Sequence, residues 1–138
     1  MRLGIYEILH LVAIKPSFNE RVEELKKHAG NQALLKILDY TFNKNYKFLL
    51  PEGTPPYKPN EYVDQTSNLY QEVRRIYLFL EGGNPNLRQH KREALFIQLL
   101  ETVDKDDAKI LIAMKDHKSP LPNITDKLVK TAFPDLIK

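Results

Sequence analysis

Apolar residues recur at helical spacing along most of the chain. Near its start, Ile5, Ile8, Leu9 and Val12 fall on one stripe of a helix, which is the spacing of an amphipathic α-helix. The Lys-Pro pair at residues 15–16 would end that helix, because proline lacks the backbone N–H that a helix needs. No segment alternates apolar and polar residues as a strand would, so we expect an all-α fold.

Polar caps mark the next two helices. Ser17, with Glu20 three residues later, has the spacing of a capping box and opens a helix through "SFNERVEELKKHAG". Asn31 is placed to cap the helix "QALLKILDYTF", whose leucines line one face. The connections between these first helices are very short, so we expect them to pack as neighbours.

A proline-rich segment then interrupts the helical pattern. Four prolines and one glycine lie between residues 51 and 59, and this composition excludes a helix. We therefore predict a long irregular loop near residues 51–62, of the kind that either has a function or drapes over a core. Tyr46, Tyr57 and Tyr62 are expected to anchor this loop rather than to stack on bases.

Helical spacing returns after the loop. In "SNLYQEVRRIYLFLEGG", a period of 3.6 residues predicts one buried side, and a pair of glycines ends the helix. The residues predicted on that buried side are Leu69, Val73, Ile76, Tyr77 and Leu80.

Three more helices complete the predicted set. Asn86 is expected to cap "NPNLRQHKREALFIQLLETV", and Asp104 to cap "KDDAKILIAMKDH" with Asp107 at the capping-box position. Thr125 should cap a short last helix that Pro134 stops. The expected architecture is a compact bundle of six to seven helices with one long proline-rich loop, forming a single domain over residues 1–138.

Composition and charge narrow the class of protein. The 138 residues are 42% hydrophobic and contain no cysteine, which excludes disulfides and thiolate metal sites. No apolar run reaches the roughly 18 residues needed to span a membrane, so we expect a cytoplasmic protein with no membrane partner. The net charge of +3 is mildly basic, which is compatible with a nucleic-acid partner without requiring one.

Familiar catalytic patterns are missing. The sequence holds no GxxxxGK[ST] phosphate loop, no GxGxxG and no HExxH. Its four histidines are scattered one to a helix, and the acidic group Asp104, Asp106 and Asp107 is explained by the preference of carboxylates for a helix N-terminus. We therefore expect no enzymatic activity, no metal and no cofactor.

Two basic segments are candidates for phosphate contacts. The first lies on the fifth predicted helix, and the second surrounds the last turn, "KSPLPNITDKLVK", where Thr125 would present a helix N-terminus. That turn has an alternative interpretation as an ordinary corner at the end of a domain. The candidate nucleic-acid-binding residues are Arg88, Lys91, Arg92, Lys115, Lys118, Thr125, Lys127 and Lys130.

The order of segments resembles the N-terminal helical DNA-binding domain of ATP-dependent DNA ligases from T4-like tailed phages. Residues 3–50 carry the short first helix, the Glu- and Lys-rich second helix, the "NQALLK" helix start and the "YTFNKNY" segment that follows. Residues 98–137 carry "DDAKILIAMKD", the capped short helix and the "FPDLI" ending. The segment between them, 51–97, is similar only in length and helical character.

The resemblance implies a stand-alone phage protein that acts in the bacterial cytoplasm during infection. The chain has no K-x-D-G lysine of the ligase catalytic domain, so no ligation is expected, and its "KSPLPN" turn lacks the glycine usual in the ligases. One hypothesis is a non-catalytic module that binds double-stranded DNA through the phosphate backbone. The other is an adaptor for a host or phage replication or transcription protein, and a virion component is a third, less favoured reading.

Overall fold

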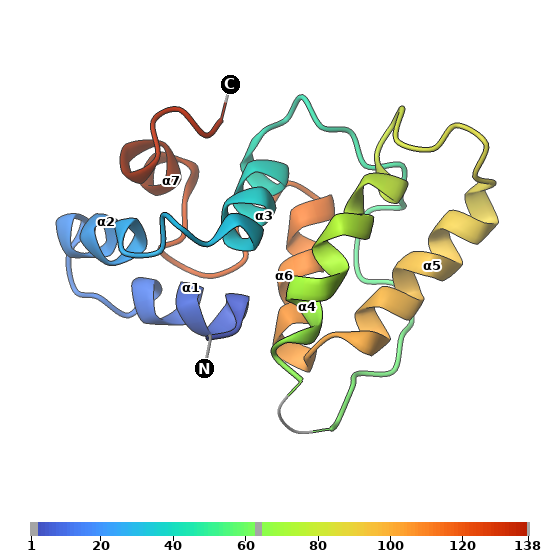
Figure 1. Cartoon of the computed structure of the whole chain (residues 1–138), viewed down its shortest axis with the longest axis horizontal. Helices are drawn as coiled ribbons and strands as arrows, with labels where there is room; N and C mark the ends of the chain where they lie inside the picture. Colours follow the sequence, from blue (N-terminus) through green and yellow to red (C-terminus); the bar gives the residue numbers. More distant parts are fainter. Residues whose placement is uncertain (1–2, 63–64, 138) are drawn as a thin grey trace.

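The computed structural model describes residues 3–62 and 65–137, so residues 1–2, 63–64 and 138 of the predicted single domain lie outside the described residues. Within those ranges the chain is all-α, as predicted, and contains no strand beyond an isolated antiparallel bridge between Phe48 and Leu80. The elements in chain order are α1 (Ile5–Ala13), α2 (Phe18–Lys26), α3 (Gln32–Phe42), α4 (Asn68–Glu72), the 3-10 helix η1 (Val73–Phe79), α5 (Gln89–Thr102), α6 (Lys105–Lys115) and α7 (Asp126–Ala132) (Figure 1).

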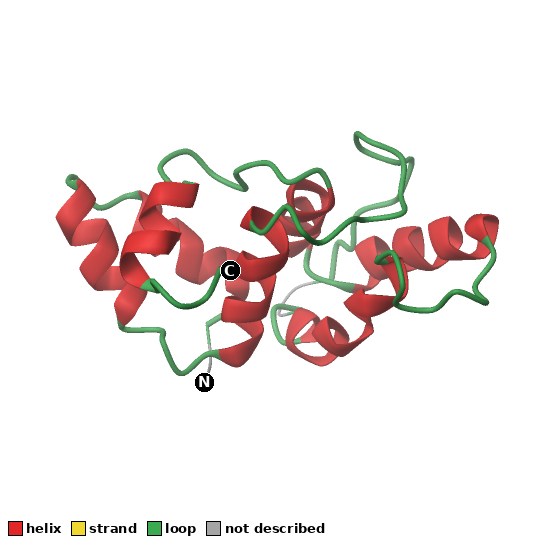
Figure 2. Ribbon diagram, turned by 90° about the horizontal axis from the view of Figure 1, so that it is seen from above, coloured by secondary structure: helices red, strands yellow, loops and turns green. Residues whose placement is uncertain are grey.

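The helices form two groups around a central pair. Helices α3 and α6 pack against each other in the middle of the molecule, with α1, α2 and α7 on one side and α4, η1 and α5 on the other (Figures 1 and 2). Helix α2 packs on α7, and α1 reaches across to α6, so segments from the two ends of the chain are interleaved. The α4–η1 segment packs against both α3 and α5.

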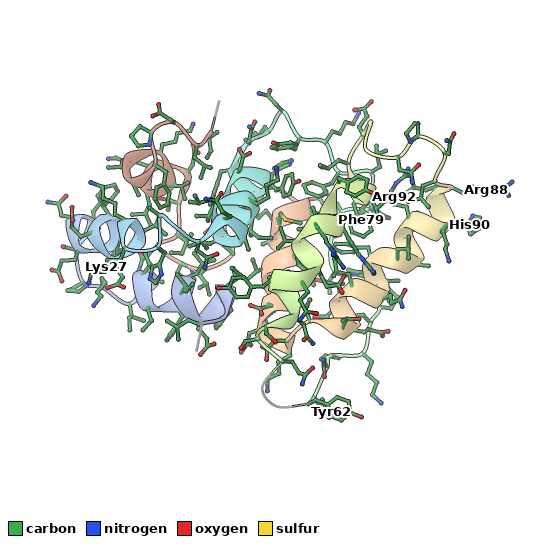
Figure 3. The ribbon with its side chains drawn as sticks, viewed as in Figure 1. Lys27, Tyr62, Phe79, Arg88, His90 and Arg92 are labelled. Carbon is green, nitrogen blue, oxygen red and sulfur yellow. The ribbon has the colours of Figure 1, made fainter. Side chains whose placement is uncertain are left out.

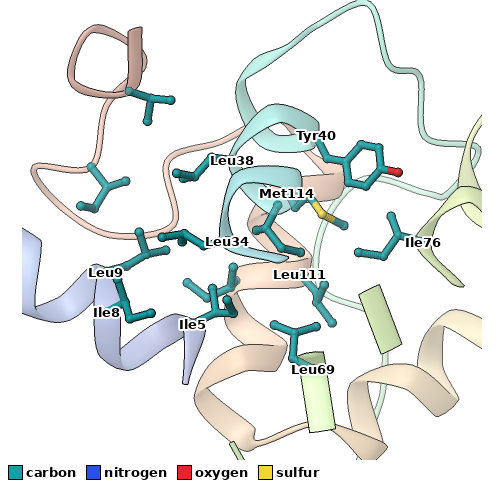
Figure 4. Close-up of a cluster of buried hydrophobic side chains, with 14 of the residues drawn as sticks. Ile5, Ile8, Leu9, Leu34, Leu38, Tyr40, Leu69, Ile76, Leu111 and Met114 are labelled. Carbon is teal, nitrogen blue, oxygen red and sulfur yellow. The ribbon is translucent and has the colours of Figure 1, made fainter. Parts of the chain in front are cut away.

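One hydrophobic core runs through both groups (Figure 4). The predicted stripe of Ile5, Ile8, Leu9 and Val12 is buried on the inner face of α1. Leucines of α3, together with Leu111 and Met114 of α6, fill the centre, and side chains of α4 and η1 extend the core toward α5. Each large aliphatic side chain that is fully buried contributes about 1.5–3 kcal/mol to folding before entropy is subtracted.

Local capping signals were mostly confirmed. The hydroxyl of Ser17 accepts from the N–H of Glu20 at 3.2 Å, and the side chain of Asn31 accepts from Leu34 at 3.1 Å. Asp104 caps α6, accepting from the N–H of Asp106 at 3.0 Å.

Two capping predictions were wrong. Asn86 does not cap α5: the helix begins at Gln89, with Arg88 at the N-cap position, and the chain turns at Asn84, whose side-chain oxygen accepts from the N–H of Asn86. Asp107 does not complete a capping box, because its carboxylate accepts instead from the N–H of Tyr6 on α1, at 2.9 Å. Both predictions failed because a partner or a turn from another part of the chain competes with the local signal.

The proline-rich loop is present, and side chains of α5 and α6 tie it down. We call residues 51–62 the strap. At its first end, Lys115 Nζ donates to the carbonyl of Pro51 at 2.9 Å, and the N–H of Gly53 donates to Asp116 Oδ2 at 3.1 Å. At its second end, the N–H of Lys58 donates to Glu101 Oε2 at 2.8 Å. Side chains thus hold the strap in place, where its prolines have no backbone N–H to donate a hydrogen bond.

The three tyrosines expected to anchor the loop do not behave alike. Tyr46 and Tyr57 are partly buried and pack against the core, and the Tyr46 hydroxyl donates to Asp39 at 3.0 Å. Tyr62 is 81% exposed and projects from the lower edge of the molecule (Figure 3), so it is not an anchor.

The segment predicted as one long α-helix after the loop winds mainly as a 3-10 helix. After five residues of α4 the chain tightens into η1, which has three residues per turn instead of 3.6. Ile76 and Phe79 are buried, one turn apart, and Val73 packs on the same edge. Tyr77, predicted to face the core, is 48% exposed, because the tighter winding rotates it out of the buried stripe. Leu69, Ile76 and Leu80 are buried as predicted.

Candidate nucleic-acid interface

Arg92, a predicted phosphate contact, is a structural residue. It is 5% exposed, its Nε donates to the carbonyl of Leu78 at 3.2 Å, and its Nη2 donates to the carbonyl of Leu87 at 3.1 Å. Its Nη1 donates to Gln89 Oε1 at 2.6 Å. Arg92 therefore ties the end of η1 to the loop before α5, next to Phe79 (Figure 3), and it is withdrawn from the candidate contacts.

Lys115 is likewise held inside the protein. Its side chain is 2% exposed, and Nζ lies 2.7 Å from Asp116 Oδ1 in addition to its bond to the strap. An ammonium buried this deeply and already paired cannot reach a phosphate. The burial of Lys115 was not predictable from the sequence, because the strap residue that accepts from it lies 64 positions away.

The cations around the last turn are exposed but already have partners. Lys118 pairs with Glu52 at 3.5 Å, and Lys130 pairs with Asp126 at 3.1 Å. Lys127 Nζ lies 5.3 Å from the centre of the Phe18 ring, within the range of a cation–π contact. Thr125 caps α7 as predicted, accepting from the N–H of Leu128 at 3.2 Å.

The turn itself is closed by its own hydrogen bonds. At the end of α6, His117 adopts a left-handed φ of 54°, and the N–H of Lys118 returns to the carbonyl of Ala113 at 2.9 Å, which is a Schellman motif. The backbone of Asn123 is also left-handed, with φ 73°. Its side-chain Nδ2 donates to the carbonyl of Ala13 at 3.1 Å. These bonds fasten the turn to α1 and favour its interpretation as a structural corner.

His117 also braces this corner from the side. Its ring nitrogens Nδ1 and Nε2 lie 2.9 and 2.8 Å from the carbonyl oxygens of Thr41 and Tyr46, respectively. The end of α6 is thereby joined to the end of α3 and to the segment that follows α3.

Basic side chains without a carboxylate partner lie at the start of α5. Arg88, His90 and Lys91 are exposed, and none of them has a carboxylate partner within 4.0 Å among the described residues. Arg88 and His90 project away from the body of the protein at the far end of α5 (Figure 3). Arg88 and Lys91 therefore keep their place as candidate phosphate contacts.

A groove lies between η1 and the later part of α5. Arg75 on η1 lines one wall of the groove, and Leu95 on α5 lines the other. Arg75 Nε lies 3.6 Å from Oε2 of Glu72. Lys91 precedes Leu95 by four residues and so lies one helical turn away on the same face of α5. We call this the η1–α5 groove, and the residues that line it are Glu72, Arg75, Leu78, Phe79, Leu95, Gln98, Leu99 and Thr102.

Sequence reasoning missed the arginines of η1. Arg74 and Arg75 are both exposed, and Arg74 has no ion-pair partner among the residues that the structure describes. The adjacent arginines "RR" could have indicated a basic site. They were overlooked because the surrounding segment, residues 51–84, has a net negative charge. The packing of η1 against α5 places Arg75 across from the later part of α5, where it lines a groove with Gln98 and Leu99.

Fold and site together define an all-helical protein with exposed cations on η1 and at the start of α5 that have no carboxylate partner among the described residues. Residues 8–120 match the model of a family of unknown function (DUF6433), and the chain belongs to that family. No curated protein and no solved structure matches the chain.

The described residues contain neither a membrane-spanning helix nor a metal-binding cluster. No helix in residues 3–62 and 65–137 has both the length and the apolar character needed to cross a membrane. In the same ranges, no group of three or more histidine, cysteine or carboxylate side chains is arranged to hold a metal ion.

Proposed function

We propose that this protein is a non-catalytic module that binds double-stranded DNA through its phosphate backbone. The observation that carries the proposal is a set of exposed cations that have no carboxylate partner among the described residues: Arg74 on η1, and Arg88 and Lys91 at the start of α5, the helix on which η1 packs. Lysine and arginine contacts to phosphate release counterions, and this gives affinity without sequence preference.

The choice of duplex DNA rests on the resemblance to the N-terminal helical domain of phage DNA ligases. That resemblance also makes a phage accessory role in the host cytoplasm part of the proposal. No catalytic step is assigned, because the sequence has no K-x-D-G lysine to form an adenylate.

The lysines around the last turn are expected to be weaker phosphate contacts. Lys118 and Lys130 are engaged in ion pairs whose side chains are more than half exposed. Such pairs contribute only about 0–1 kcal/mol, so a phosphate can displace the carboxylate, but it must compete with it. The three cations of η1 and α5 meet no such competition.

The test compares two triple variants across a salt series. Arg74→Gln/Arg88→Gln/Lys91→Gln should weaken duplex binding alike for all sequences, and should flatten log K against log salt by about one unit per lost contact. Lys118→Gln/Lys127→Gln/Lys130→Gln is the matched variant, and its loss should be smaller. If wild type binds duplex DNA and the first triple variant matches it in affinity and slope, these three cations are not the interface.

A second candidate function is a protein–protein adaptor. It is favoured by an apolar hollow between the strap and α5, lined by Leu50, Pro51, Pro55, Phe96 and Ile97 among others, which can receive an apolar side chain. A pull-down from phage-infected cells with and without nuclease separates the two functions. A partner protein retained after nuclease treatment supports the adaptor, whereas one lost with the nucleic acid supports the DNA-binding module.

A further inference from the structure

The 3-10 winding of η1 sorts its side chains onto three edges. With three residues per turn, residues three apart are eclipsed along the helix. One edge, which carries Ile76 and Phe79, is buried, and a second, Arg75 and Leu78, lines the η1–α5 groove. The third edge carries Arg74 and Tyr77, both exposed. We call this pair the outer edge of η1.

Tyr77 differs from most aromatic residues of the chain in being open to solvent. Its side chain is 48% exposed, whereas Phe79, two residues later, is 2% exposed and packs edge-to-face on Phe96 with ring centres 5.2 Å apart. The phenol ring of Tyr77 makes no ring contact with another aromatic among the described residues. No other aromatic ring therefore covers it, and its exposed half is open to a flat partner.

The backbone beneath this ring is firmly fixed. The carbonyl of Tyr77 accepts from the N–H of Leu80 at 3.1 Å, which closes the last turn of η1. Gly83 lies so close to that carbonyl that a Cβ at position 83 would stand 1.8 Å from the oxygen. A ring on a fixed base loses little entropy when a ligand stacks on it, so more of the contact energy appears as affinity.

Arg74 adds charge one turn away from the ring. A 3-10 turn advances about 6 Å, so the guanidinium and the phenol ring can engage the phosphate and the base of neighbouring nucleotides. Proteins that bind single strands combine cations that follow the backbone with aromatic rings on which bases stack. Inside a duplex the base faces are covered by their neighbours, so away from a blunt end only an unpaired base can lie on such a ring.

We propose that the outer edge of η1 is a stacking site for an unpaired base, with Tyr77 under the base and Arg74 at its phosphate. The inference rests on the proposed function and narrows its substrate: the protein prefers DNA in which a single-stranded segment adjoins a duplex. The duplex contacts Arg88 and Lys91, and the base of the first unpaired nucleotide reaches Tyr77. Arg74, which contacts a duplex phosphate in blunt DNA, then contacts the phosphate of that unpaired nucleotide.

The experiment compares two labelled DNAs, a blunt duplex and the same duplex with a short thymidine overhang, by fluorescence anisotropy. Wild type should bind the overhang DNA about tenfold more tightly than the blunt duplex, in keeping with the effect of one base–aromatic stack. Tyr77→Leu should abolish this gain and leave blunt-duplex binding unchanged. Tyr77→Phe should keep the gain, because it retains the ring.

Tyr62→Leu is the matched control, since Tyr62 is the more exposed tyrosine, at 81%, but lies on the strap. It should leave the gain intact, and thermal melts should show that all variants are folded. If wild type binds both DNAs equally, or if Tyr77→Leu keeps the gain, the stacking site is overturned while the duplex-binding function stands. If wild type binds neither DNA, both proposals fail together.

Discussion

The backbone N–H of Tyr6 donates a 2.9 Å hydrogen bond to Oδ1 of Asp107, joining the first turns of α1 and α6. Asp107 is fully buried, and its other oxygen, Oδ2, has no partner within the described residues. Burial is the largest cause that raises the pKa of Asp107, and it outweighs the lowering by the Tyr6 hydrogen bond. With the nearby carboxylates of Asp104, Asp106 and Glu7 added, the pKa is raised to about 7.

This carboxyl makes stability depend on pH. Its ordinary pKa of 3.8 applies to the unfolded chain, so between about pH 4 and pH 7 the folded protein holds a proton that the unfolded chain has lost. The free energy of unfolding therefore falls as the pH rises through that window, by at most about 1.4 kcal/mol per pH unit from this group. Above about pH 7 the contribution is lost and the dependence levels off.

Asp107→Asn should remove that part of the pH dependence, because the amide oxygen still accepts from Tyr6 but does not titrate. Denaturant unfolding of wild type and variant from about pH 4 to about pH 8 measures the two slopes. Glu23→Gln, which alters an exposed carboxylate, should keep the wild-type slope. Identical slopes in all three proteins would show that Asp107 is not the group responsible.

Arg92→Gln should lower the free energy of unfolding by about 3 kcal/mol, because it removes a buried guanidinium and leaves the part-buried carbonyls of Leu78 and Leu87 without that donor. Arg88→Gln, four residues earlier on the exposed surface, should change it by less than about 0.5 kcal/mol. Urea denaturation measures both values. A small loss for Arg92→Gln would mean that the loop before α5 is held by other contacts.

Gly83→Ala should be strongly destabilising, since the new methyl group would overlap the carbonyl of Tyr77. The backbone must shift, and we expect a loss above about 2 kcal/mol. Gly30→Ala is the comparison: a Cβ there meets nothing within 4 Å, so stability should stay level or rise by up to about 1 kcal/mol. Equal melting temperatures for the two variants would contradict the close approach at Gly83.

Thr125→Ala should cost about 1 kcal/mol through loss of the cap on α7. Thr131→Ala, on the exposed side of the same helix, should cost less than about 0.5 kcal/mol. Thermal unfolding of the two variants separates capping from a general effect of removing a hydroxyl group. Matching losses would argue against the cap.

Features set by neighbouring residues were predictable from the sequence. The caps at Ser17 and Asn31 depend on atoms three residues away, and the apolar stripe of α1 follows from spacing alone. Burial of Arg92 was not predictable, because it depends on a loop folding back over the start of α5. The sequence does not distinguish a charged side chain that faces solvent from one that donates to the carbonyl of a distant residue.

The position of Tyr77 illustrates a second limit. An α-helical period places it inside and a 3-10 period places it outside, and the apolar residues around it fit both periods over so short a segment. The choice is made by tertiary packing, including the contact between Gly83 and the carbonyl of Tyr77. The candidate interface was therefore only half predictable: Arg88 and Lys91 came from the sequence, whereas Arg74 and the groove needed the packing of η1 on α5.

The packing of α2 against α7 has a consequence for synthesis of the chain. Val22 and Leu25 of α2 are buried in a structure that also needs Leu128 and Val129 of α7. Because chains leave the ribosome from the N-terminus at about 5–20 residues per second, α2 waits several seconds before α7 emerges. During that time α1 can cover part of the apolar face of α2, but the part that packs on α7 is uncovered, so the nascent chain is a candidate client for chaperones that hold unfolded chains.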